Sequence, residues 1–172
     1  QSKINGTITD ILVAPIGAIE MLIAYVGAAM IRAMIVGTLV YLVALFFTWF
    51  PLHHLGWTVF FTVFVTATLA LLGMIAALWA EKFDHLAIFP NFVLLPLAFL
   101  GGVFYSIDLL PEPWNTVSRL NPLLYMVNGL RYGFLGVADV SPTMSAVVVL
   151  VSFATLLAVA SALLRSGYNV RS

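Results

Sequence analysis

Residues 33–80 read AMIVGTLVYLVALFFTWFPLHHLGWTVFFTVFVTATLALLGMIAALWA and include no Asp, Glu, Lys or Arg. An α-helix needs about 20 apolar residues, at 1.5 Å per residue, to cross the hydrocarbon core of a bilayer. The stretch is therefore too long for one membrane-spanning helix and long enough for two. Its middle, PLHHLG at 51–56, has residues typical of a turn. The sequence predicts spans over about 26–49 and 57–80.

Two further uncharged runs, at 85–107 and 140–164, extend this pattern. Each has the length of one span, which predicts spans at about 86–107 and 143–165. The expected fold is an all-α, polytopic transmembrane helical bundle, with a single transmembrane domain over residues 1–172. The chain begins with Gln rather than Met. We therefore expect it to be the C-terminal portion of a longer protein.

The overall composition excludes most soluble classes of protein. Apolar residues make up 63% of the 172 positions, while charged residues make up 8% at zero net charge. So few charges do not keep a soluble domain of this size dispersed. A nucleic-acid-binding protein would need a basic surface, which this chain lacks. The absence of Cys removes disulfides, iron–sulfur ligation and thiolate zinc sites.

The placement of Lys and Arg predicts the orientation in the membrane, since these residues favour the cytoplasmic side. With four spans, both termini lie on one side. Five basic residues fall on that side: Lys3, Arg32, Lys82, Arg165 and Arg171. Two fall on the other side, Arg119 and Arg131. The termini are therefore expected in the cytoplasm, with Arg32 at the membrane surface.

Small residues recur every four positions within the predicted spans. They form two triplets and one pair: Ala29, Ala33 and Gly37; Ala154, Ala158 and Ala162; Gly73 and Ala77. Such stripes allow close approach of membrane helices. They predict helix–helix contacts, unless they only reflect how common Ala and Gly are in membrane helices.

The N-terminal segment contains a short amphipathic stretch, Thr7 to Val13. At helical spacing, Ile8, Ile11 and Leu12 share one face, while Thr7 and Asp10 lie off it. Such a helix is too short to span. It either lies on the membrane surface or docks into a groove of a soluble partner.

The segment from 101 to 136 is too polar for a span and too apolar for an ordinary loop. Pro90, Pro96 and Gly101–Gly102 interrupt the span before it. Two short helices are then expected, from about Pro113 to Leu120 and from Pro122 to Leu135. Asn121 is a favourable cap for the second, and proline is favourable at a first helical position. Since neither helix can span, a re-entrant hairpin on the external side is predicted at about 113–135.

Three motifs in this order resemble the permease subunits of bacterial ABC-2 type transporters. They are NGTITDILVAP at 5–15, EKFDHLAIFPNFVLLPLAFLGGVFYSIDLLPEPW at 81–114, and SRLNPLLYMVNGLRYGFLG at 118–136. The similarity runs over essentially the whole chain. Permeases of this kind have six spans, so the resemblance implies that this chain holds spans three to six and lacks the first two.

The resemblance also implies roles for particular residues. The segment at 5–15 would be the coupling helix that contacts the ATP-binding subunit, through Thr7, Ile8, Asp10, Ile11 and Leu12. The external re-entrant hairpin would include Trp114, Asn121, Pro122, Tyr125 and Arg131. The implied assembly is a dimer of permeases with a dimer of ATPases in the bacterial inner membrane. Its cargo would be amphipathic: a drug, a lipid or a glycan.

No chemistry of its own is evident in the chain. Neither Lys3 nor Lys82 lies in a phosphate-binding loop, so ATP and Mg²⁺ are expected in the partner subunit and no cofactor or metal is expected here. His53 and His54 are adjacent in a turn and cannot converge with His85 across the membrane. Two alternatives stay open: an integral-membrane enzyme acting on lipid at the external surface, and a membrane scaffold.

Overall fold

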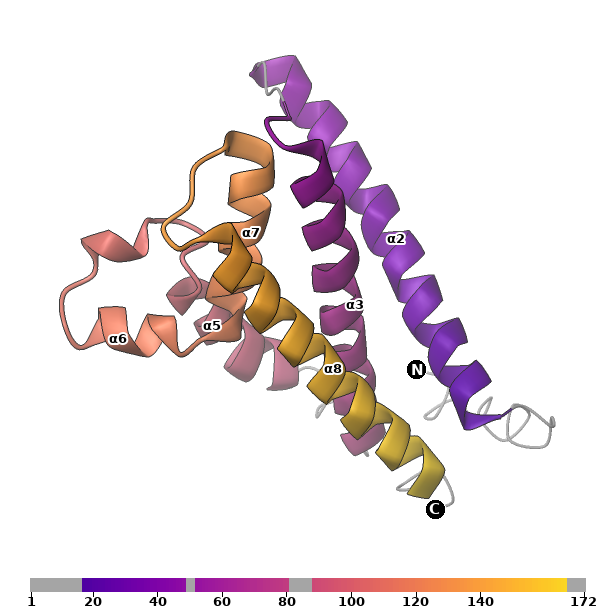
Figure 1. Ribbon diagram of the computed structural model, residues 1–172. Coiled ribbons are helices and arrows are strands. Elements are labelled where there is room, and N and C mark those ends of the chain that lie inside the picture. Colours follow the sequence, from indigo (N-terminus) through magenta and orange to yellow (C-terminus); the bar gives the residue numbers. More distant parts are fainter. Residues whose placement is uncertain (1–16, 49–51, 81–87, 167–172) are drawn as a thin grey trace.

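The computed structural model describes residues 17–48, 52–80 and 88–166, and within these ranges all regular structure is helical. The prediction of an all-α fold is thereby confirmed. The elements follow one another as α2 (Ala18–Phe47), α3 (Leu55–Trp79), η1 (Phe89–Leu94), α5 (Leu95–Leu100), η2 (Ile107–Leu109), α6 (Trp114–Arg119), α7 (Pro122–Leu135) and α8 (Pro142–Ser166). Figure 1 shows their arrangement. The predicted coupling helix at 5–15 and residues 81–87 lie outside the described residues.

Three helices are long and apolar enough to cross a membrane: Ile19–Phe47 in α2, Leu55–Trp79 in α3 and Pro142–Arg165 in α8. Many of their large apolar side chains point outward. Val40, for example, is 63% exposed and Phe46 is 89% exposed. Exposed apolar surface of this extent suits lipid rather than water. The prediction of a transmembrane helical bundle is therefore confirmed.

The first membrane-length helix begins earlier than expected, at Ala18 rather than at 26. Its start is stabilised by Glu20, whose carboxylate accepts a hydrogen bond from the Gly17 backbone N–H at 3.2 Å. An acidic side chain in the first turn also complements the helix dipole. The 30 residues of α2 extend over about 45 Å. Arg32 consequently lies in the middle of the helix rather than at its start.

The predicted span at 86–107 is not one continuous membrane-length helix. Within its described part, π-helix η1 continues directly into α5, and the helical run Phe89–Leu100 is too short to count as a span. Helical hydrogen bonding stops at Gly101–Gly102, where Gly102 adopts a φ of 71°. That left-handed conformation is readily available only to glycine. The chain then turns away through η2 into α6.

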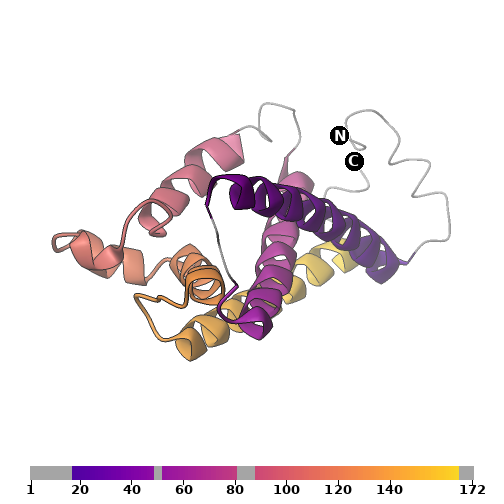
Figure 2. The ribbon, with the colours of Figure 1, turned by 90° about the horizontal axis from the view of Figure 1, so that it is seen from above.

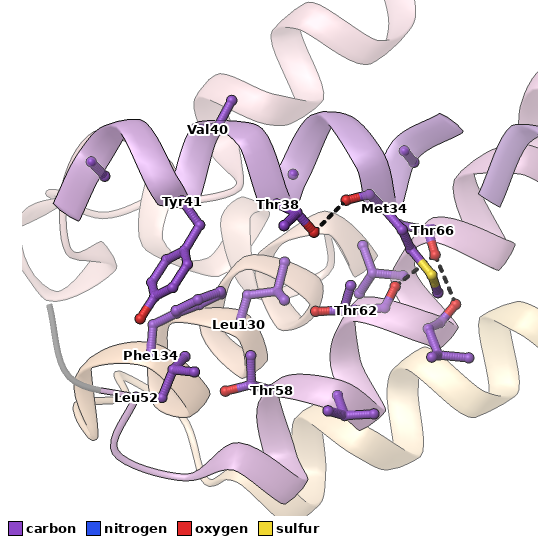
Figure 3. A pocket seen from close by; sticks show the side chains of 16 residues that line it. Met34, Thr38, Val40, Tyr41, Leu52, Thr58, Thr62, Thr66, Leu130 and Phe134 are labelled. Carbon is purple, nitrogen blue, oxygen red and sulfur yellow. Dashed lines mark hydrogen bonds between the residues drawn. The ribbon is translucent and has the colours of Figure 1, made fainter. Parts of the chain in front are cut away.

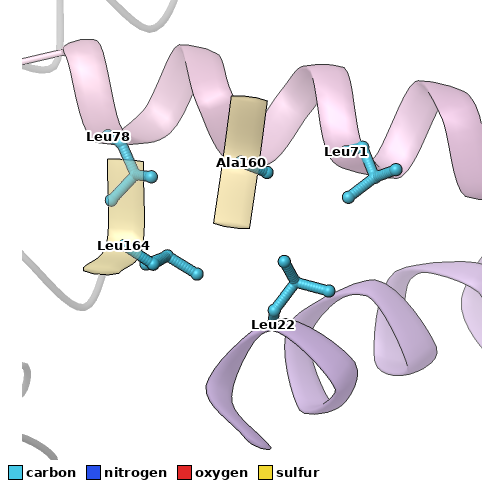
Figure 4. Close-up of a cluster of buried hydrophobic side chains, with 5 residues drawn as sticks. All are labelled: Leu22, Leu71, Leu78, Ala160 and Leu164. Carbon is cyan, nitrogen blue, oxygen red and sulfur yellow. The ribbon is translucent and has the colours of Figure 1, made fainter. Parts of the chain in front are cut away.

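Helix α3 occupies the centre of the bundle, between α2 and α8 (Figure 2). At one end, a cluster joins the start of α2 to the ends of α3 and α8; its buried residues are Leu22, Leu71, Leu78, Ala160 and Leu164 (Figure 4). At the other end, Phe61 and Val65 of α3 pack with Met126 of α7 and Val149 of α8. The start of α2 and the end of α8 thus lie at the same end of the bundle, away from α7.

The small-residue stripes are not the main helix contacts. All eight positions, in both triplets and the pair, are exposed. The bundle is instead held by large side chains such as Leu71 and Phe61, both fully buried. The prediction that these stripes form bundle contacts is therefore wrong for the described part of the chain. The small residues that do pack closely lie in α7.

Candidate functional site

Helix α7 begins where the sequence predicts, because Asn121 and Pro122 are strong local start signals. Pro122 is its first residue, and the Asn121 side-chain oxygen accepts a hydrogen bond from the Leu123 backbone N–H at 3.0 Å. The same amide group donates from its nitrogen to the Leu97 carbonyl oxygen of α5, at 2.6 Å. Asn121 is 5% exposed. One buried side chain therefore satisfies backbone groups at the end of α5 and at the start of α7.

Replacing Asn121 tests this double role. Asn121→Ser retains an acceptor for the Leu123 N–H but does not reach Leu97, whereas Asn121→Ala loses both bonds. We expect destabilisation of about 1 kcal/mol for Ser and about 2 kcal/mol for Ala, since a lost cap and an unsatisfied buried carbonyl each cost about 1 kcal/mol. Thermal unfolding of the purified protein in detergent measures both. Equal losses for the two variants would contradict the contribution of the Leu97 bond.

The far end of α7 is anchored by the turn before α3. The backbone N–H groups of His53 and His54 donate to the carbonyl oxygens of Phe134 and Gly133, at 3.4 and 3.0 Å. These carbonyls belong to the last turn of α7, where intrahelical partners are missing. Gly136 ends the helix at a φ of 71°. Both ends of α7 are therefore tied to other elements.

One face of α7 lies directly against α3 through two glycines spaced by four residues. A Cβ atom on Gly129 would overlap the ring of Phe61. A Cβ atom on Gly133 would lie 2.6 Å from the Thr58 hydroxyl oxygen and 2.9 Å from the Thr58 backbone. This close approach is the arrangement that small residues provide between membrane helices.

A different face of α7 carries Asn128, whose amide joins α7 to the segment before α8. Its oxygen accepts from the backbone N–H groups of Asp139 and Val140, at 2.8 and 3.2 Å. Its nitrogen donates to the Val140 carbonyl at 2.7 Å and to the Ser145 hydroxyl at 2.8 Å. Asn128 is 2% exposed and Ser145 is fully buried. The segment around 139–140 is thereby fixed to α7 and α8.

Arg131 and Asp139 connect α7 and the segment before α8 to residues 102–107, which follow α5. Their side chains form an ion pair at 2.9 Å, and Arg131 also donates to the Gly102 carbonyl. The Asp139 carboxylate accepts from the Ser106 hydroxyl at 2.9 Å and from the Ile107 backbone N–H at 3.3 Å. The pair is partly buried. Arg131 therefore pairs with a nearby acid and holds the start of the hairpin segment.

The remaining candidate residues of the hairpin are peripheral. Trp114 begins α6 and is 53% exposed. Tyr125 donates from its hydroxyl to the Arg119 carbonyl at 2.8 Å, which links α7 to the end of α6. The residues assigned to the coupling helix, Thr7, Ile8, Asp10, Ile11 and Leu12, lie outside the described residues.

The sequence did not predict the structural roles of four residues that organise this site: Asn128, Gly129, Gly133 and Asp139. The pair Gly129–Gly133 had a detectable signal, since it shows the same four-residue spacing as the stripes that were noted. Asn128 had a weaker one, as an amide within an otherwise apolar helix. Asp139 had only its charge as a signal, because its role depends on Arg131 and Ser106 lying beside it in space.

A cavity of about 730 Å³ lies between α2, α3 and the end of α7 (Figure 3). Ala33, Gly37 and Ala44 of α2 line it, so part of the small-residue stripe borders this space. The rings of Tyr41 and Phe134, with centroids 5.8 Å apart, lie at one end. Among the described residues, no group of three or more His, Asp and Glu is placed to hold a metal ion.

Comparison with known proteins places this arrangement in a family. The family model described as "ABC-2 type transporter" matches residues 1–135. The chain belongs to the ABC-2 type transporter family. In this ABC-2 protein, helices α5 to α7 lie in the segment that connects the membrane-length helices α3 and α8.

Individual relatives agree with the family. The chain is 39% identical to the inner membrane transport permease YadH of Escherichia coli (strain K12) over 173 aligned residues, which cover 99% of this chain and 67% of YadH. YadH of Shigella flexneri matches equally. Nodulation protein J of Rhizobium leguminosarum bv. trifolii is 31% identical over 67 residues, 39% of this chain and 26% of that protein. No solved structure gives a significant match.

Proposed function

We propose that this ABC-2 chain belongs to a permease of the bacterial inner membrane that exports an amphipathic molecule with energy from a separate ATP-binding subunit. The family match over residues 1–135 carries this proposal. The 39% identity to an inner membrane transport permease supports the proposed location in the inner membrane and the proposed transport activity. The chain covers about two thirds of that relative, so the proposal concerns the whole permease. The permease would work as a homodimer in a lipid bilayer, and the ATP-binding subunit would hold ATP and Mg²⁺.

The arrangement of the bundle supports the proposed orientation. The beginning of α2 and the end of α8 share one end, whereas the turn at 52–54 contacts α7 at the other. If the shared end faces the cytoplasm, the segment at 5–15 meets the ATP-binding subunit and the α6–α7 hairpin is external. Arg131 is engaged with Asp139 and the Gly102 carbonyl. This engagement favours a structural role for Arg131 over the alternative of an enzyme that uses it on lipid.

Charge reversal in the coupling segment tests the partner. In the full-length permease, Asp10→Arg combined with Leu12→Asp is expected to weaken co-purification of the ATP-binding subunit by about tenfold or more, equivalent to ~1.4 kcal/mol. Transport-linked ATP hydrolysis should fall with it. The matched control is Glu112→Arg, a reversal at an exposed position beside α6, at the proposed external side. Unchanged hydrolysis in the Asp10/Leu12 variant, or equal loss in the control, would contradict the coupling role.

A further inference from the structure

The cavity between α2 and α3 has the size and composition of a ligand site. Its volume of about 730 Å³ falls within the roughly 300–1,000 Å³ typical of small-molecule sites. None of its 16 lining residues is Asp, Glu, Lys, Arg or His. Two of its walls are membrane-length helices. A ligand therefore reaches it from the hydrocarbon phase and carries no charge into it, since an unpaired charge there is costly.

Besides the Tyr41 hydroxyl at one end, four threonines give this apolar space its polarity: Thr38 of α2, and Thr58, Thr62 and Thr66 of α3. Three hydroxyls donate to carbonyl oxygens of their own helix. Thr38 donates to Met34 at 2.8 Å, Thr58 to His54 at 3.1 Å and Thr66 to Thr62 at 2.6 Å. These three present only lone pairs to the cavity, and so offer a ligand acceptors but no donors.

Thr62 differs from the other three. Its hydroxyl has no acceptor within the described part of the chain, and Figure 3 shows it facing the cavity alongside Leu130. It is the lining threonine whose donor is available to a ligand. An oxygen atom with lone pairs, such as an ester or amide carbonyl, complements this hydroxyl. The rest of the cavity suits hydrocarbon.

We propose that this cavity holds the acyl chain of the amphipathic cargo, with the Thr62 hydroxyl donating a hydrogen bond to the carbonyl oxygen at the head of that chain. The inference rests on the proposed export function and adds the chemical class of the cargo: an acylated molecule whose charged or sugar-bearing end stays outside the cavity. No Asp, Glu, Lys, Arg or His lines the cavity to neutralise that end.

A second cavity provides an internal comparison. It has about 340 Å³ and lies on the other side of α3, between α2 and α8. Its lining includes Leu22, Gly27, Leu71 and Phe153 but no side-chain hydroxyl. Gly37 borders the first cavity and Gly27 the second, and a Cβ atom on either glycine would meet nothing within 4 Å. Leucine at each position therefore fills one cavity without a clash at Cβ.

The experiment uses the full-length permease with its ATP-binding subunit in nanodiscs that contain a phosphatidylethanolamine with a photoactivatable diazirine acyl chain. Photolabelling of peptides from α2 and α3 is measured by mass spectrometry. We expect Gly37→Leu to reduce labelling of residues lining the first cavity by about tenfold, and Gly27→Leu to leave it unchanged. Thr62→Val, which keeps the side-chain shape, is expected to reduce it by about fivefold, the order of one hydrogen bond.

Several outcomes would overturn the inference. Absence of label in the unaltered protein would mean that protein fills the cavity. Equal labelling in all variants, or labelling that does not change during ATP turnover, would identify ordinary boundary lipid instead of cargo. If labelling follows the expected pattern while neither the unaltered complex nor any variant shows transport-linked ATP hydrolysis, the proposed function fails and acyl-chain binding stands. If ATP-driven transport persists in Gly37→Leu and Thr62→Val, the cavity assignment fails alone.

Discussion

Gly133→Ala is expected to lower the free energy of unfolding by about 3 kcal/mol, although alanine is the better helix former by about 1 kcal/mol. The added methyl carbon would lie 2.9 Å from the backbone N and Cα of Thr58. A backbone cannot rotate out of the way as a long side chain does, so α7 and α3 must separate. Thermal unfolding in detergent, together with the yield of monodisperse protein, measures the effect.

A matched substitution separates packing from helix propensity. Gly73 lies in α3, and a Cβ atom there would meet nothing within 4 Å. Gly73→Ala should therefore be neutral or stabilising by up to about 1 kcal/mol. Gly129→Ala should destabilise like Gly133→Ala, but Phe61→Leu should partly rescue it, because its clash is with a side chain. Similar unfolding temperatures for Gly73→Ala and Gly133→Ala would show that α7 does not depend on this close contact.

Breaking the pair of Arg131 and Asp139 is the second large effect expected. Arg131→Met leaves the Asp139 carboxylate without its cation, and Asp139→Asn leaves the guanidinium without its anion. Because both groups are partly buried, we expect each change to destabilise the protein by about 2 kcal/mol, between the values for exposed and fully buried pairs. Chemical or thermal unfolding of the single and double variants gives the coupling.

The double variant is the decisive comparison, because once one partner of the ion pair is removed, replacing the other costs less stability. Its destabilisation should be smaller than the summed single effects by about 1 kcal/mol. Arg119→Met is the control, since Arg119 is exposed and its Nε bonds to Asn115 one turn earlier in α6. Its cost should stay within about 0.5 kcal/mol. Strictly additive effects of Arg131→Met and Asp139→Asn would show that the ion pair contributes nothing beyond its separate hydrogen bonds.

The parts of the fold that the sequence predicted are those set by local chemistry. Uncharged runs gave three membrane-length helices, since hydrocarbon tolerates little else at that length. Asn121 and Pro122 placed the start of α7 at the correct residue because cap and first-turn preferences act over only a few positions. The predicted hairpin helices agree closely with α6 and α7.

The parts that the sequence did not predict depend on residues distant along the chain. The role of Asp139 requires Ser106 and Arg131 to lie beside it, and Gly133 matters because Thr58 is its neighbour. The start of α2 at Ala18 was not predicted either, because a span that begins at 26 is already long enough to cross the membrane, and hydropathy alone does not show that the helix extends through Glu20.

The hydrogen bonds of Asn128 have a consequence for how the protein is made. Its partners Val140 and Ser145 follow it by 12 and 17 residues. When α7 leaves the ribosome, the amide has none of them, and a bare amide is costly in an apolar setting. The hydrogen bonds of Asn128 are therefore complete only once the first turn of α8 has emerged and lies beside α7. We therefore expect the hairpin and the last membrane helix to assemble together, since a chain that ends before Pro142 lacks the hydrogen bond from Asn128 to Ser145.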